Sequence, residues 1–203
     1  MCMKQKPKEA KIAAESRDGQ KPLHEGPVKI LGMLRNCHSS SQELLRGLSY
    51  LSTESLRGIG AYRAVREYMD KVKMGADYDK DCGYRLAEVL VRSSGDEGQA
   101  VEELLNFVAA KPLVGCEVGV YMAYLKFDKE GQNAILCALL ETGLDTENPN
   151  VLATALKSLN KICVGDRSSR SAIAAAQYMV LGKLGHENEE VRSAAGRLLS
   201  VLS

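Results

Sequence analysis

The sequence predicts an all-α fold, and three observations carry that prediction. From residue 27 to the C-terminus, apolar residues recur at intervals of three and four, the spacing of one helix face. The strict apolar–polar alternation that is typical of a half-buried strand does not occur in this stretch. The short breaks between apolar segments contain residues that start or stop helices, such as Asp128, Pro149 and Gly185. We therefore expect helices joined by short turns.

The predicted helices group into five helix–turn–helix hairpins. In chain order, these hairpins span residues 27–52, 54–93, 97–127, 129–164 and 168–202. Hairpins that begin roughly 27 to 43 residues apart are typical of helical repeat proteins. A hairpin of this size cannot bury its apolar face alone, so each must stack on its neighbours. We therefore expect residues 27–203 to form an α-solenoid, and a compact helical bundle is the alternative.

The last hairpin resembles a HEAT repeat. Its first helix, SSRSAIAAAQYMVLGKLG, is followed by the turn HENEE and by the second-helix segment VRSAAGRLL. The Val191-Arg192 pair, the alanines and the two leucines stand where the HEAT family has Val-Arg, Ala and Leu. His186 stands where the family usually has aspartate, and the hairpin 129–164 follows the same outline less closely. The resemblance implies a right-handed solenoid of HEAT-like or armadillo type, in which Arg192 stays at the turn and bonds carbonyl groups or acidic neighbours.

The N-terminal segment differs in charge from the rest of the chain. Residues 1–21 contain six basic and three acidic side chains, and subtracting these from the 27 basic and 26 acidic residues of the whole chain leaves 21 and 23. We therefore expect residues 1–26 to form a flexible basic arm and the repeat domain to begin at residue 27. An arm that docks on RNA or another polyanion is the alternative, and the lysines that would contact it are Lys4, Lys6, Lys8 and Lys11.

The residues that usually carry catalysis are sparse. The six cysteines form no CxxC pair, and the sequence has no P-loop, HExxH or GxSxG motif. Among HEAT-like enzymes, deoxyhypusine hydroxylase binds two irons through several His-Glu pairs, whereas here His24-Glu25 lies in the arm and His186-Glu187 precedes a turn. HEAT-like DNA glycosylases use aromatic residues in a basic cleft, and this chain has no tryptophan and only two phenylalanines. We expect a non-enzymatic protein with no catalytic residue, metal or cofactor.

The segment 113–127, LVGCEVGVYMAYLKF, is apolar on nearly every side of its predicted helix. One stripe consists of Val114, Val118, Met122 and Leu125, and the other of Cys116, Val120, Tyr124 and Phe127. A helix of this kind at the centre of a stack is expected to be buried on most sides. In the functional alternative, Tyr124 and Phe127 protrude and anchor a partner, because aromatic residues dominate interface hot spots.

Basic residues recur on the predicted second helices of the hairpins: Arg85 and Arg92, Lys157 and Lys161, and Arg192 and Arg197. The HEAT resemblance implies that these helices line the concave face, where a basic row takes an acidic peptide or a phosphate backbone. Glutamates interleave with the basic residues, which favours the alternative of an ordinary solvated face.

We therefore predict a protein–protein interaction adaptor or a structural subunit of a larger assembly. The alternative is a nucleic-acid-binding or ribonucleoprotein-associated module that uses the basic arm. No apolar run approaches the ~18 residues that a bilayer-spanning helix needs, so we expect no membrane contact. We expect a cytoplasmic location, with the nucleus as the alternative.

Overall fold

The computed structural model describes residues 48–73 and 82–203 of the chain. In chain order, its regular elements are α3 (Thr53–Gly58), α4 (Ala61–Lys73), α5 (Cys82–Ser93), α6 (Glu97–Ala110), α7 (Cys116–Tyr124), α8 (Lys129–Leu144), α9 (Pro149–Gly165), the 3₁₀ turn η1 (Arg167–Ser169), α10 (Arg170–Ala174), α11 (Gln177–Gly182), the 3₁₀ turn η2 (Lys183–Gly185) and α12 (Glu189–Leu202). All of these elements are helical, and the described ranges contain no strand. The predicted all-α class is confirmed, and the predicted hairpin 27–52 lies almost wholly outside the described residues.

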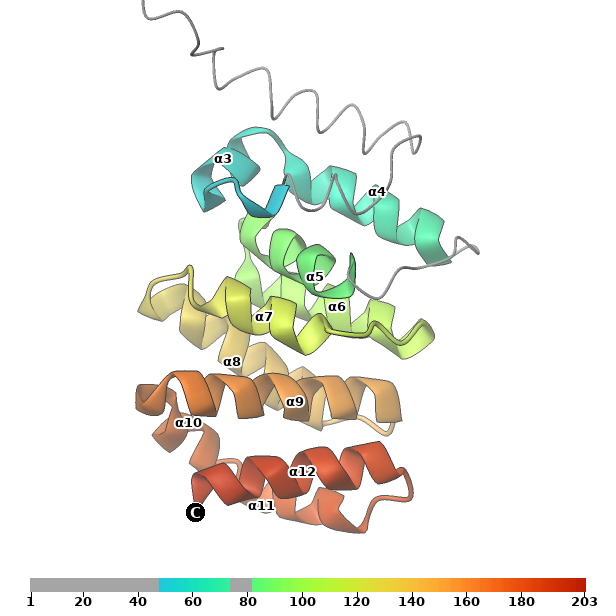
Figure 1. Ribbon diagram of the computed structural model, residues 1–203, viewed down its shortest axis with the longest axis vertical. Coiled ribbons are helices and arrows are strands. Elements are labelled where there is room, and N and C mark those ends of the chain that lie inside the picture. The colour runs from blue at the N-terminus through green and yellow to red at the C-terminus, as the bar shows by residue number, and fades with distance from the viewer. Residues whose placement is uncertain (1–47, 74–81) are drawn as a thin grey trace, which may run out of the picture.

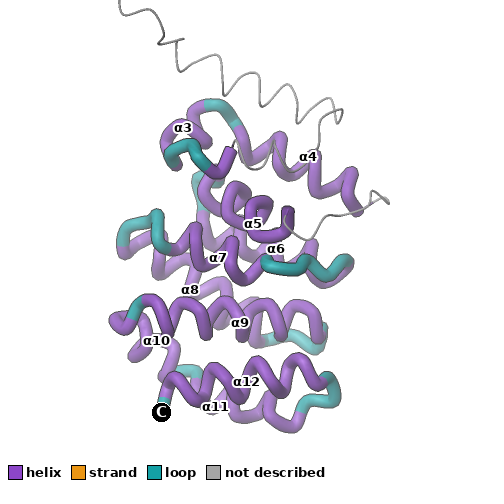
Figure 2. The backbone as a smooth tube through the Cα atoms, in the orientation of Figure 1, coloured by secondary structure: helices purple, strands orange, loops and turns teal. Residues whose placement is uncertain are grey.

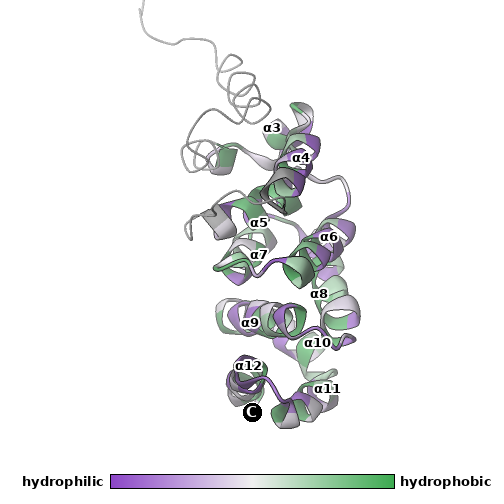
Figure 3. Ribbon diagram, turned by 90° about the vertical axis from the view of Figure 1, so that its right-hand side faces the viewer, coloured by the Kyte–Doolittle hydropathy of each residue, from purple (hydrophilic) through white to green (hydrophobic). Residues whose placement is uncertain are grey.

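The helices form two layers. In Figure 3, α5, α7, α9 and α12 follow one another in one column, and α6, α8, α10 and α11 form the other. Consecutive members of the first column contact each other, α5 with α7, α7 with α9 and α9 with α12. Figure 2 shows that the described loops between helices are short. α7 buries the side that faces the second column and exposes residues on its opposite side, whereas α5 is buried on every side from Leu86 to Ser93.

Two predicted hairpins differ from the structure in their helices. The segment 54–93 contains three helices, because the chain turns between α3 and α4 at Gly60, whose φ of 66° is a conformation that glycine adopts without strain. The expected first helix of segment 168–202 is divided into η1, α10, α11 and η2. At this division the N–H of Ala176 bonds the carbonyl of Ile173 at 3.0 Å, which tightens the turn into 3₁₀ geometry.

The apolar core runs between the two layers over the whole described length. Leucines from both layers have no solvent-exposed surface, among them Leu86, Leu104, Leu139, Leu156 and Leu198. Burying one such side chain stabilises a fold by about 1.5–3 kcal/mol. Because every unit contributes to this continuous core, the units stabilise one another through their contacts.

Two glycines allow α5 and α7 to approach closely. A Cβ atom on Gly119 would lie 2.0 Å from the carbonyl oxygen of Tyr84, and one on Gly83 would lie 2.0 Å from the carbonyl oxygen of Val114. Both clashes involve backbone atoms, which cannot move aside as the end of a side chain can. The α7 face that bears Gly119 must therefore point towards α5, and this fixes which side of α7 faces outward.

The turns before α9 and α12 are built in the same way. Asn148 caps α9, and its side-chain oxygen accepts hydrogen bonds from two backbone N–H groups of the first turn; Asn188 does the same for α12. Two residues earlier, Thr146 Oγ1 accepts the N–H of Asn148 at 3.1 Å, and His186 Nδ1 accepts the N–H of Asn188 at 3.0 Å. The histidine thus provides a side-chain acceptor for the backbone N–H of Asn188, as an aspartate would at this place.

Candidate functional site

The two stripes of α7 face in opposite directions. Cys116 and Val120 have no exposed surface and Tyr124 is 1% exposed, so this stripe lies in the core. The other stripe faces solvent. We call its four residues, Val114, Val118, Met122 and Leu125, the apolar row; Val114 is 60%, Met122 36% and Leu125 47% exposed, and Val118 is half-buried. The structure therefore exposes an aliphatic row on a central helix.

The predicted aromatic anchors do not protrude. Tyr124 is buried and donates its hydroxyl hydrogen to Asp166 Oδ2 at 2.6 Å. Phe127 is half-buried against the core, and the guanidinium of Arg57 lies 5.7 Å from the centre of its ring. The prediction of protruding anchors is wrong for Tyr124, because its side chain belongs to the buried stripe of Cys116 and Val120 and its hydroxyl is bonded to Asp166.

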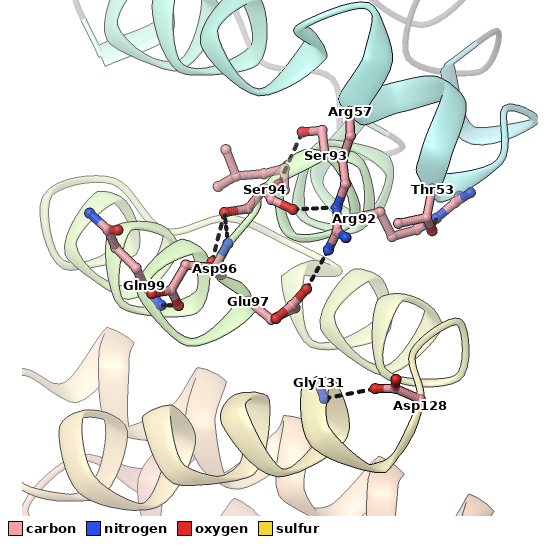
Figure 4. A network of polar contacts seen from close by, with 11 residues as sticks. Thr53, Arg57, Arg92, Ser93, Ser94, Asp96, Glu97, Gln99, Asp128 and Gly131 are labelled. Atoms are coloured by element: carbon pink, nitrogen blue, oxygen red, sulfur yellow. Dashed lines mark hydrogen bonds and ion pairs between the residues drawn. The ribbon is translucent and has the colours of Figure 1, made fainter.

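Arg57 joins α3 to the turn before α6. Its Nε donates to the carbonyl oxygen of Ser94 at 2.6 Å, and its guanidinium forms an ion pair with Glu97 (Figure 4). Asp96, in the same turn, caps α6 by accepting the N–H of Gln99. The polar groups at this end of the described chain therefore make contacts that hold neighbouring helices together.

Three of the predicted basic residues on second helices also make intramolecular contacts. Arg92 is 3% exposed and pairs with Glu88 at 2.7 Å. Arg85 donates to Ser49 Oγ at 2.7 Å, and its guanidinium lies 4.8 Å from the ring centre of its neighbour in sequence. Arg192 donates to the carbonyl oxygens of residues 186 and 187 at 2.8 and 2.7 Å, which confirms the prediction that it stays at the turn.

The other three basic residues, Lys157, Lys161 and Arg197, gather in one place, and we call them the basic group. They line a hollow between α9 and α12 together with Glu117 from α7. Lys157 forms an ion pair with Glu190 on α12. Lys161 and Arg197 form no ion pair with any residue in the described part of the chain. The basic group therefore keeps two cations free for other interactions.

The helices that carry these residues run in the same direction. Near their N-terminal ends, α7 and α9 share a hollow lined by Val114 and Asn150. Near their C-terminal ends, Gly165 of α9 packs against the ring of Tyr121 of α7. Lys161 of α9 and Arg197 of α12 likewise line one hollow. Figure 1 shows α9 and α12 as neighbours in the stack. The apolar row and the lysines of α9 thus form two roughly parallel lines on the outer side of one layer.

We call this surface the α7–α9–α12 face. It consists of the apolar row, the basic group and Val164, which is 60% exposed at the C-terminal end of α9. Contiguous apolar side chains beside unpaired charges mark interaction surfaces more often than catalytic centres do. The sequence pattern identified the apolar row as a stripe without showing which way it faces, and the small residues Gly119 and Ala123, which lie between the two stripes, were the signal that could have oriented it.

A second group of exposed apolar side chains lies at the end of the described stack. Tyr178, Leu181 and Leu184 of α11 and η2 are 73%, 50% and 43% exposed. They belong to the other layer and share no element with the α7–α9–α12 face. This group provides a matched control for substitutions in the apolar row.

The described part of the chain brings no set of metal-ligating side chains together, and two of its thiols are buried. Within residues 48–73 and 82–203, no three histidine, cysteine, aspartate or glutamate side chains come together as metal ligands would. Cys116 and Cys163 are buried, and burial raises the pKa of the Cys163 thiol to about 11 and that of Cys116 further. A thiol with a raised pKa is a poor nucleophile at neutral pH.

None of the described helices has the length and apolar character that a bilayer crossing requires.

The arm lysines, Lys4, Lys6, Lys8 and Lys11, lie outside the described residues, so their predicted role stays a prediction. Of the other predicted binding residues, the structure brings Lys157, Lys161 and Arg197 together and places Arg85, Tyr124, Phe127 and Arg192 elsewhere. A comparison of the chain with protein-family models, curated proteins and solved structures finds no match.

Proposed function

We propose that this chain is a non-enzymatic protein-interaction subunit, an adaptor or a structural component of a larger assembly, that binds a partner protein through the α7–α9–α12 face. We further propose that the chain is a right-handed, HEAT-like or armadillo-type α-solenoid of about five hairpins. The layered stacking of α5, α7, α9 and α12 supports this architecture. A rigid stack would hold the binding residues in place before the partner arrives, which lowers the ordering cost of association.

The observation that carries the proposal is the exposure of the apolar row. Met122 and Leu125 are large apolar side chains that are 36% and 47% exposed, although five of the nine residues of α7 are buried. Covering apolar area by a partner is favourable at about 25 cal/mol per Å². The same face carries Lys161 and Arg197, which form no ion pair among the described residues, so it combines apolar and charged side chains, as interfaces commonly do.

The test is a binding measurement with a variant of the apolar row. Tagged full-length chain is used to isolate a co-purifying protein from its own cells, and that protein is then produced pure. We expect Met122→Glu/Leu125→Glu to weaken its affinity at least tenfold, because each glutamate would bring an unpaired carboxylate into an apolar contact. The control, Tyr178→Glu/Leu181→Glu, makes the same chemical change on the other layer and should leave the affinity unchanged. Equal effects of both variants, or no effect of the first, would refute the proposed site.

The arm remains the basis of the alternative function. The excess of basic residues in segment 1–21 favours binding to a nucleic acid or a ribonucleoprotein, and such binding weakens steeply with salt. If the chain retains RNA at low salt and loses it when residues 1–21 are deleted, the arm is the binding element. Retention that does not change after the deletion would eliminate this role.

A further inference from the structure

We infer that the segment bound at the α7–α9–α12 face is an amphipathic helix with carboxylates along one edge. This inference rests on the proposed function, because it names the chemistry of the partner at that same face. Two features of the face carry it, namely the shape of the apolar row and the arrangement of the charges beside it.

The apolar row favours a helical partner. The backbone beneath it belongs to α7, to the turns at the two ends of α7 and to α9, so the face has no strand edge to which an extended peptide could add. An extended segment lying over aliphatic side chains would leave its own N–H and C=O groups without partners, whereas a helix satisfies them internally. The nine residues of α7 span ~13 Å at 1.5 Å per residue, and Val114 and Leu125 extend the row beyond its two ends. A partner helix of about three turns would cover it.

The charges beside the row indicate the sign of the charge that the partner carries. The two lysines of α9 follow one another one turn apart, roughly parallel to the apolar row. Lys157 is already paired with Glu190. The remaining charged side chains that line the hollow are Lys161 and Arg197, which are positive, and Glu117, which is negative. The unpaired charge of this hollow is therefore positive, and Glu189 lies in the adjoining hollow on the other side of Arg197. A helix whose apolar side rests on α7 would direct one of its flanks towards α9 and α12, and carboxylates on that flank would meet Lys161 and Arg197.

The experiment uses the full chain and three labelled peptides of about 18 residues, long enough to form helix. One peptide has a leucine stripe with a glutamate flank, the second has the same stripe with a lysine flank, and the third is a scramble of the first. Fluorescence anisotropy measures their affinity. We expect the acidic amphipathic peptide to bind at least tenfold more tightly than either of the others. Equal binding of the lysine or scrambled peptide, or a Kd for the acidic peptide weaker than about 1 mM, would overturn the inference.

Charge reversal of the protein provides the reciprocal measurement. Lys161→Glu/Arg197→Glu is expected to lower the affinity for the acidic peptide about tenfold and to raise the affinity for the lysine peptide. Each ion pair at the rim contributes about 2- to 5-fold, and charge reversal adds repulsion. Arg63→Glu/Lys183→Glu changes the net charge equally away from the face and should leave both affinities as they are. An unchanged affinity of the acidic peptide for the first variant would overturn the inference.

The two proposals fail in different ways. If the acidic peptide does not bind but the purified partner protein still loses affinity with Met122→Glu/Leu125→Glu, the proposed binding face stands and the inferred helix chemistry is wrong. If the affinity of the partner protein is unchanged by Met122→Glu/Leu125→Glu, the proposed function at this face is wrong, whichever peptides bind.

Discussion

The hydroxyl of Tyr124 donates a hydrogen bond of 2.6 Å to the carboxylate of Asp166, and this bond ties α7 to the turn that follows α9. Asp166 also accepts hydrogen bonds from the hydroxyl and the N–H of Ser168 at 2.6 and 2.9 Å. These donors, with Ser168 making the largest contribution and Tyr124 the next, lower the pKa of Asp166 from 3.8 to about 2. Burial and the same bond raise the pKa of Tyr124 above its ordinary value. The bond therefore joins the helix of the apolar row to the helix of the lysines.

Removing the tyrosine hydroxyl should destabilise the fold. In Tyr124→Phe the ring stays in the core and Asp166 loses one donor, and a hydrogen bond to a charged group contributes about 1.5–3 kcal/mol. We expect the free energy of unfolding in urea to fall by about 2 kcal/mol. Tyr178→Phe, at a tyrosine that is 73% exposed, serves as the control and should have almost no effect. Equal effects of the two substitutions would contradict the role assigned to this bond.

The same carboxylate should make stability depend on acid pH. Because the pKa of Asp166 is lower in the folded chain than in the unfolded chain, its contribution is fully present above about pH 4 and is lost as the pH falls towards about 2. The difference in unfolding free energy between the wild type and Asp166→Asn should therefore be constant near neutral pH and shrink below about pH 4. Urea unfolding at a series of pH values measures it. A difference that stays constant down to pH 3 would show that Asp166 carries no such shift.

Any side chain at position 119 should destabilise the fold, because α5 and α7 pack closely there. In Gly119→Ala the new Cβ would lie 2.0 Å from the carbonyl oxygen of Tyr84, so α5 and α7 would have to separate. We expect a loss of more than about 3 kcal/mol, or a failure to fold. Gly196→Ala makes the same change within α12, where the nearest atom is 4.0 Å away, and should stabilise the fold by about 0.5–1 kcal/mol through helix propensity. Similar melting temperatures for the two variants would contradict this account of the α5–α7 contact.

The turn before α12 should require a side-chain hydrogen-bond acceptor at position 186, and either a histidine or an aspartate should serve. His186→Ala removes the group that binds the N–H of Asn188, and we expect a loss of about 1 kcal/mol. His186→Asp restores an acceptor and adds a negative charge near the helix N-terminus, so its stability should equal or exceed that of the wild type. Thermal unfolding of the three proteins at pH 7 compares them. An aspartate variant as unstable as the alanine variant would show that the histidine contributes by packing.

The sequence was sufficient for the helical class and for many turn residues, because those depend on local chemistry. Pro149 begins α9 and Asp128 caps α8, as their residue types predict. The division of the segment 168–185 at Ala176 was not predictable from the sequence, because an alanine-rich stretch gives no local reason for a helix to break. That turn is a property of the packing around Ile173 and Val180, which are both buried.

The sequence does not predict which side of α7 faces solvent. Both of its stripes are apolar and both have helical spacing, so periodicity alone could not decide which one is buried. The decision depends on the contact of Gly119 with the backbone of α5, which joins residues far apart in the sequence. The grouping of Lys157, Lys161 and Arg197 likewise depends on the alignment of α9 with α12, while Arg192, on the same helix as Arg197, is used at its own turn.

Site-specific photo-cross-linking would test the central claim most directly. A photoreactive amino acid is placed at Met122 in the apolar row and, in a second protein, at Asn106, an exposed residue of α6 in the other layer. We predict that one defined protein is cross-linked in cells through position 122 and is absent from the products of position 106. Cross-linking of the same protein at equal yield from both positions, or from position 106 alone, would contradict a binding site on the α7–α9–α12 face.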